Sequence, residues 1–220
     1  MNLTIQGNPE DRRKGDKATV NVSKNVGVLE RLSLAYYTTP IAVALFHESI
    51  VAQAVFYLGK LQQNDNTVLI SDLIKTSVFI QDIFKNEFLS KDESTNFDET
   101  KVKQILSVAQ SKKIAEVDFD KGQLKIVAKS ATKNILRFLR DLLQSYADSY
   151  LVVAQTISCL QELGVTIEQS KLLSQLHLSI QSLHNDGIIK YMNSCLIEVL
   201  QTAFGRFSEL GICESQAYDT

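Results

Sequence analysis

The sequence contains little of what builds turns and disulfide frameworks. Its 220 residues include no tryptophan, two prolines, nine glycines and three cysteines. The scarcity of proline and glycine leaves little room for a turn-rich β fold, and the many Leu, Ile, Ala, Gln, Ser and Lys residues favour helices. The three cysteines form no CxxC pair, so we expect buried, reduced thiols and a reducing compartment.

Charge of either sign is also not in excess. The formal net charge is −2, and the charged fraction of 22% and hydrophobic fraction of 45% are ordinary for a soluble globular chain. Nothing in these totals requires a polyanionic partner. Residues 1–26 contain no apolar run of the kind found in a secretory signal. We expect residues 1–27 to form a flexible polar arm, residues 28–213 a single helical domain, and residues 214–220 a tail.

Familiar nucleotide-binding and hydrolase motifs are missing. The sequence has no GxGxxG, no Walker loop, no GxSxG and no HExxH. His177 and His184 are seven residues apart on one expected helix, but no third ligand of suitable type and spacing joins them. We therefore predict neither a metal site nor a cofactor.

The most apolar stretch of the chain, residues 36–59, raises the question of membrane insertion. It is long enough to span a bilayer, but His47, Glu48 and Gln53 form a polar strip on one side of the expected helix. Charged groups near the centre of a span are costly. The pattern favours a core or domain-interface helix over a helix lying at a membrane interface, and disfavours a transmembrane span.

The same three residues are the candidate site of the chain. His47 and Glu48 are adjacent, so on a helix they point about 100° apart and cannot form an acid–base pair alone. A hydrogen-bonded structural role is the favoured interpretation of His47. We therefore predict no catalytic residue, and we treat His47, Glu48 and Gln53 as marking a candidate interface helix.

The rest of the chain predicts a mainly α fold of about seven helices with one inserted β-hairpin. The segment Ile114–Val127 alternates apolar and polar residues around an Asp-Lys-Gly turn, which is typical of a hairpin. A helix is expected to begin at Asp98, and the sequence TIEQ at 166–169 is a capping-box pattern expected to open a later helix.

Two helices followed by a hairpin suggest a winged-helix-like arrangement over residues 70–127. Such a unit could act as an adaptor or bind duplex DNA through its second helix. That helix offers only four lysines, with acidic residues at its start, whereas phosphate-binding surfaces normally show a basic footprint. Nucleic-acid binding is therefore the less favoured alternative.

Several ordered stretches resemble the C-terminal region of the glycerol-3-phosphate and dihydroxyacetone-phosphate acyltransferases. The match covers the chain from about Leu29 to Ile212. It is carried by segments whose order and spacing agree with that family: RLSLAYYTTPIAVALFHESIVAQA, VFIQDIFKNEFL, FDETKVKQILSVAQSKKIAEVDFDKGQLKIV, LLQSYADSYLVV and GIIKYMNSCLIEVLQTAFGRFSELGIC.

The resemblance implies an accessory role in phospholipid and glycerolipid biosynthesis. In that family an upstream domain uses a His-x-x-x-x-Asp motif to transfer an acyl group from acyl-CoA to glycerol phosphate. None of the three histidines here has an aspartate five residues later. The resemblance thus implies a helical domain whose partner is an acyltransferase catalytic domain, in cis or in trans. It also implies peripheral membrane contact at the mitochondrial outer membrane, the endoplasmic reticulum or the peroxisome.

Overall fold

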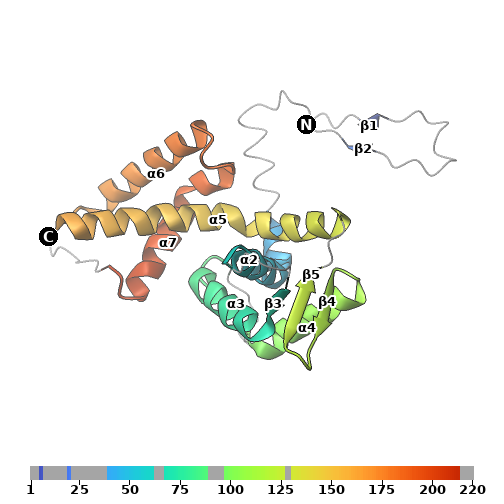
Figure 1. Ribbon diagram of the computed structural model, residues 1–220. Coiled ribbons are helices and arrows are strands. Elements are labelled where there is room, and N and C mark those ends of the chain that lie inside the picture. The colour runs from blue at the N-terminus through green and yellow to red at the C-terminus, as the bar shows by residue number, and fades with distance from the viewer. Residues whose placement is uncertain are drawn as a thin grey trace.

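The structure, a computed structural model, is mainly helical with a small three-stranded antiparallel sheet (Figure 1). This confirms the expected class of about seven helices with one inserted hairpin. The structure describes residues 5–6, 19–20, 39–61, 67–88, 97–126 and 130–213. The predicted arm and tail, and residues 28–38 of the expected domain, lie outside these residues. The exceptions are two paired strands, β1 (Ile5–Gln6) and β2 (Thr19–Val20).

The sheet and three helices form one part of the molecule, which we call the sheet unit. Its elements are α2 (Phe46–Leu61), β3 (Thr67–Leu69), α3 (Ile70–Phe84), α4 (Glu99–Ser111), β4 (Ala115–Asp118) and β5 (Gln123–Ile126). The strand order is β3-β5-β4, and Leu124 of β5 is paired with Val68 on one side and Val117 on the other. Within residues 70–126 two helices are followed by the β4–β5 hairpin, which is the order that the sequence predicts.

Local side-chain chemistry fixes the ends of these elements. Asp98 is the N-cap of α4, and its carboxylate accepts a hydrogen bond of 3.0 Å from the amide of Lys101. In the hairpin turn, Asp118 accepts from the amide of Lys121 at 3.0 Å. Gly122 then adopts a φ of +63°, which a residue without Cβ reaches at little cost. The hairpin and the start of α4 therefore lie where the sequence predicts them.

A single helix, α5 (Ser130–Leu163), runs along the whole domain (Figure 1). Its 34 residues contain neither proline nor glycine, and at 1.5 Å per residue they span about 51 Å. The helix ends where Gly164, at φ +63°, allows the amide of Val165 to bond the carbonyl of Leu160.

The remaining elements pack on the C-terminal half of α5 and form the helical unit. They are α6 (Gln169–Asn185), the 3₁₀-helix η2 (Met192–Cys195) and α7 (Ile197–Glu209). The predicted capping box at 166–169 is wrong. The N-cap of α6 is Glu168. Its carboxylate accepts a hydrogen bond from the hydroxyl of Ser170 and forms an ion pair with Lys171, and it does not bond a backbone amide of the helix. The chain is still extended at Glu168, so Thr166 comes too early to cap the helix.

One continuous core joins the two units along α5. Each α-helix that the structure describes contributes fully buried apolar side chains to it: Ile50, Leu73, Val102, Leu143, Val153, Leu176, Ile180 and Leu200. Aromatic contacts cross the junction, since the ring of Tyr150 lies 4.9 Å from Phe84 and 5.7 Å from Phe207. All three cysteines are free, but Cys159 is exposed, which corrects the expectation that every thiol is buried.

Candidate functional site

The predicted polar strip lies on α2, which is a core helix of the sheet unit. Ile50 and Ala54 have no exposed surface, and the helix packs against α3 and α5. Burial within the domain explains why this stretch is so apolar. No helix in the described ranges has the length and apolarity needed to cross a bilayer.

His47 lies half-buried at the start of α2. Its imidazole stacks on Phe97, with ring centres 5.0 Å apart. Burial, and then the positive charge of Lys101, lowers the pKa of His47, so the neutral ring is favoured at pH 7. Within the described residues no hydrogen bond joins His47 to a carboxylate. The ring therefore has the environment of a packing residue rather than of a general base.

Several polar atoms within and beside the strip are buried without a hydrogen-bond partner among the described residues. The side-chain carbonyl oxygen of Gln53 is buried and makes no hydrogen bond to any residue that the structure describes, and the same is true of the hydroxyl of Ser49. Ser77 on α3, which packs against α2, is also fully buried with an unpaired hydroxyl. Glu48 is half-buried. The three predicted residues therefore have different environments. His47 stacks on an aromatic ring, Glu48 is partly accessible, and the side-chain oxygen of Gln53 lies against the core.

A second polar cluster, which was not among the predicted sites, lies where the sheet unit meets the helical unit. Arg206 of α7 is only 3% exposed, and its guanidinium bridges Asp82 of α3 at 2.8 Å and Glu209 at 2.9 Å. Glu209 also accepts a 3.0 Å hydrogen bond from Asn86. These contacts tie the end of α3 to the end of α7, and we call them, together with Glu87, the junction cluster.

Glu87 is the most perturbed acid of the junction cluster. Burial raises its pKa to about 7, although the nearby hydroxyl of Tyr150 favours the charged form. In turn, burial and the Glu87 carboxylate raise the pKa of Tyr150. One oxygen of Glu87, the hydroxyl of Tyr150 and Nε of Arg206 are buried without a hydrogen bond of good geometry to the described part of the chain. A buried acid with such a pKa is a candidate functional group, although structural ion-pair networks also produce such shifts.

Only a weak signal in the sequence pointed to this cluster. Arg206 lies between Ala203 and Phe207, two positions of the apolar stripe of α7, so a charged residue there stands close to the core. Its partner Asp82 is remote in the sequence, and no local spacing rule predicts that contact.

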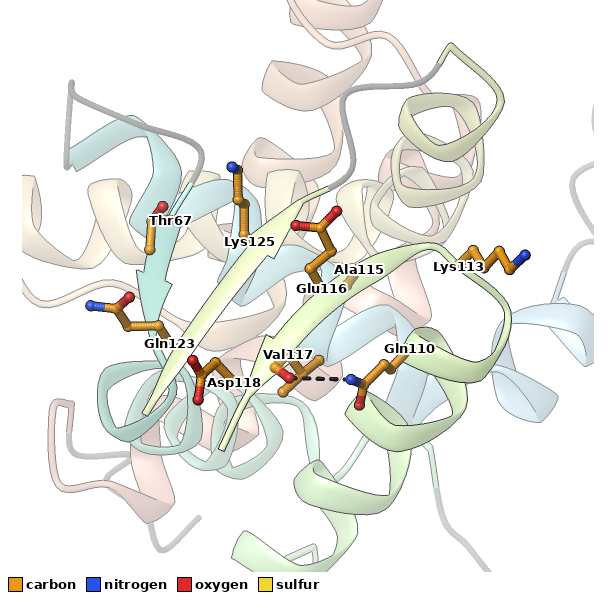
Figure 2. A pocket seen from close by; sticks show the side chains of 9 residues that line it. All are labelled: Thr67, Gln110, Lys113, Ala115, Glu116, Val117, Asp118, Gln123 and Lys125. Atoms are coloured by element: carbon orange, nitrogen blue, oxygen red, sulfur yellow. Dashed lines mark hydrogen bonds between the residues drawn. The ribbon is translucent and has the colours of Figure 1, made fainter. Parts of the chain in front are cut away.

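An open depression of about 530 Å³ lies on the exposed face of the sheet (Figure 2). Gln110 lines it and donates a 3.2 Å hydrogen bond to the carbonyl of Val117. Glu116 and Lys125 lie opposite each other on neighbouring strands. Because its charges alternate in sign and the hollow is open, it has the character of a solvated sheet face rather than of a catalytic pocket.

The two histidines of α6 each lie within hydrogen-bond distance of a nearby group of the chain. His177 lies 2.7 Å from Gln181, and His184 lies 2.9 Å from the carbonyl of Ile189. No cluster of three His, Cys, Asp or Glu side chains suited to a metal occurs in the described part of the chain. On α4, Lys103 is paired with Glu99.

Comparison with known proteins places this helical domain in a family. The model of the glycerol-3-phosphate acyltransferase C-terminal region matches residues 15–216, which is most of the chain. The chain therefore belongs to the glycerol-3-phosphate acyltransferase C-terminal region family, as the ordered sequence segments predict. A search among curated proteins found no match to the chain.

Proposed function

We propose that this chain is the accessory domain of a glycerol-3-phosphate or dihydroxyacetone-phosphate O-acyltransferase and that it binds and stabilises the catalytic domain. The family match over residues 15–216 carries this proposal. The parent reaction transfers an acyl group from acyl-CoA to a hydroxyl of the three-carbon phosphate, which needs a general base. Because the His-x-x-x-x-Asp motif is absent from the sequence, the chain alone is expected to be inert.

The start of α2 offers a surface for this association. Ile41 and Val43, in the helical residues just before α2, are 45% and 51% exposed. His47 and Glu48 follow within two turns and are half-buried. An exposed apolar pair beside partly accessible polar groups resembles the interfaces between domains of one chain, which are more polar than permanent subunit interfaces. We assign the catalytic-domain contact to this surface.

Co-purification tests the proposal. The chain is expressed with a separate glycerol-3-phosphate acyltransferase catalytic domain, and capture and acyl transfer from acyl-CoA are measured. We expect capture and higher activity with the chain present, and at least a tenfold loss of capture for Ile41→Glu with Val43→Glu. Leu178→Glu, at a 68% exposed position on α6, is the matched control and should bind normally.

Two results would contradict the proposal. Turnover by the chain alone, above the rate without protein, would show that it is itself a catalyst. Failure to bind the catalytic domain, together with a salt-sensitive mobility shift of duplex DNA, would favour the adaptor or nucleic-acid-binding alternative. We further propose that the assembled enzyme works at a membrane, either the mitochondrial outer membrane, the endoplasmic reticulum or the peroxisome, in line with the family resemblance.

A further inference from the structure

The N-terminal third of α5 leaves a row of apolar side chains exposed. Ile135 and Phe138 are 44% and 51% exposed, and Ala131 is exposed one turn earlier. Spacings of four and three residues place the three on one side of the helix. Thr132 and Leu143, on another side, are buried and hold this part of the helix against the domain.

A row of cations lies beside the apolar row. Residues 131–140 include Lys133, Arg137 and Arg140 but no aspartate or glutamate. Arg140 is already neutralised by Asp141. Lys133 and Arg137 are exposed, and neither has an ion-pair partner in the described part of the chain. The segment is therefore locally basic in a chain whose net charge is −2.

The two rows share the outward face of the helix. At about 100° per residue, Asn134 points away from the buried side, with Phe138 on one flank and Arg137 on the other. Asn134 is exposed, as this geometry requires. A flat surface laid against the helix would meet apolar and cationic side chains together. We call Lys133, Ile135, Arg137 and Phe138 the basic face of α5.

We propose that the basic face of α5 binds the anionic headgroups of a phospholipid membrane, with Ile135 and Phe138 entering the boundary between headgroups and acyl chains. Interfacial helices combine these two features, because apolar side chains gain by burial at the boundary and cations by attraction to anionic lipids. A protein partner would need acidic groups placed specifically opposite Lys133 and Arg137. A lipid surface supplies negative charge at any position.

This inference rests on the membrane association proposed above and assigns a surface to it, but it does not require the catalytic-domain partner. It concerns a helix segment different from the start of α2. The two proposals therefore fail or succeed in separate experiments, one with vesicles and one with a protein.

Vesicle co-sedimentation of the full chain tests the inference. We expect little binding to phosphatidylcholine vesicles and clear binding when part of the lipid is phosphatidylserine, with affinity falling as salt is raised. Lys133→Ser with Arg137→Ser should weaken binding about 30-fold at low salt, since each cation near the surface contributes about fivefold. Ile135→Ser with Phe138→Ser should weaken it by about tenfold or more.

Matched control variants separate the basic face from general effects of charge and hydrophobicity. Lys75→Ser with Lys112→Ser removes two exposed lysines from the sheet unit and changes the net charge equally. Leu151→Ser with Leu178→Ser removes two apolar side chains that are 56% and 68% exposed elsewhere. Both control variants should bind anionic vesicles like the unmodified chain.

The inference is wrong if the chain does not distinguish anionic from neutral vesicles, or if the basic-face variants bind them as well as the controls do. It is also wrong if those variants keep vesicle binding but lose capture of the catalytic domain. In that case the face would belong to the protein interface. Circular dichroism of each variant must show unchanged helix content, so that loss of binding is not loss of fold.

Discussion

Arg206 shows how a charged side chain is accommodated in the interior of this domain. A buried guanidinium is costly unless it is paired, and this one meets Asp82 and Glu209, whose carboxylates are about half-exposed. The partners therefore keep much of their own hydration while neutralising the arginine. The geometry explains why a cation is tolerated there, whereas the sequence shows only an arginine next to an apolar stripe.

The neighbouring acid makes stability depend on pH. The pKa of Glu87 is raised from 4.5 to about 7, so the folded state keeps a proton that the unfolded chain loses. The free energy of unfolding should therefore fall as pH rises between these two values, by about 2 kcal/mol from pH 5 to pH 8. Glu87→Gln removes this effect. The free energy of unfolding of the variant, compared with that of the unmodified chain, should therefore be about 2 kcal/mol higher at pH 8 than at pH 5.

Urea unfolding at pH 5 and pH 8 measures the Glu87 effect. Glu162→Gln, which changes an exposed carboxylate near the end of α5, is the control and should shift stability equally at both pH values. A Glu87→Gln difference that is the same at pH 5 and pH 8 would show that the carboxyl of Glu87 is not perturbed in solution.

At the scale of elements, the start of α4 rests on one side chain. Asp98→Ala removes the N-cap that bonds the amide of Lys101, and we expect a loss of about 1 kcal/mol in the free energy of unfolding. Asp120→Ala, in the exposed hairpin turn, removes the same charge without a cap and should change stability by less than about 0.5 kcal/mol. Equal losses for both variants would mean that charge, rather than capping, matters.

The elements that the sequence predicted well are those with local signals. The alternation of apolar and polar residues and the position of Gly122 predict the hairpin, and Asp98 predicts the start of α4. Strand β3 was missed because it has only three residues, Thr67–Leu69, and its pairing partner β5 follows two helices later.

The candidate site was predicted less well than the fold, for a physical reason. His47 was expected to have a hydrogen-bonded structural role, but among the described residues its half-buried ring is held by stacking on Phe97 instead, and its place on an interface helix stays a prediction. The junction cluster depends on contacts between α3, α5 and α7, which only the tertiary structure brings together. Sequence spacing describes neighbours on one helix and gives no register between helices that are far apart in the chain.

At the scale of the whole molecule, α5 joins the sheet unit to the helical unit, and one core surrounds it. We expect a single cooperative unfolding transition. Ala147→Pro, at the centre of α5, should interrupt the helix and cost about 3 kcal/mol or more. It should also separate the unfolding of the two units. The measurement is urea unfolding followed in parallel by circular dichroism and by tyrosine fluorescence.

Ala131→Pro is the control for that experiment. It places the same residue in the first turn of α5, where proline is tolerated, and should leave one cooperative transition with little loss. Coincident transitions in Ala147→Pro would contradict the view that the continuity of α5 couples the two units.

The unbroken backbone of α5 also restricts how the length of this polypeptide can vary. One extra residue in the middle of the helix would advance the helical unit by 1.5 Å and turn it by about 100° about the helix axis. Such a rotation would pull Arg206 away from Asp82 and misalign the core. Insertions and deletions should therefore be accepted in the connections before Ser130 and after Leu163 but rejected between them, because even a whole extra turn, which restores the angle, shifts the helical unit by about 5.4 Å.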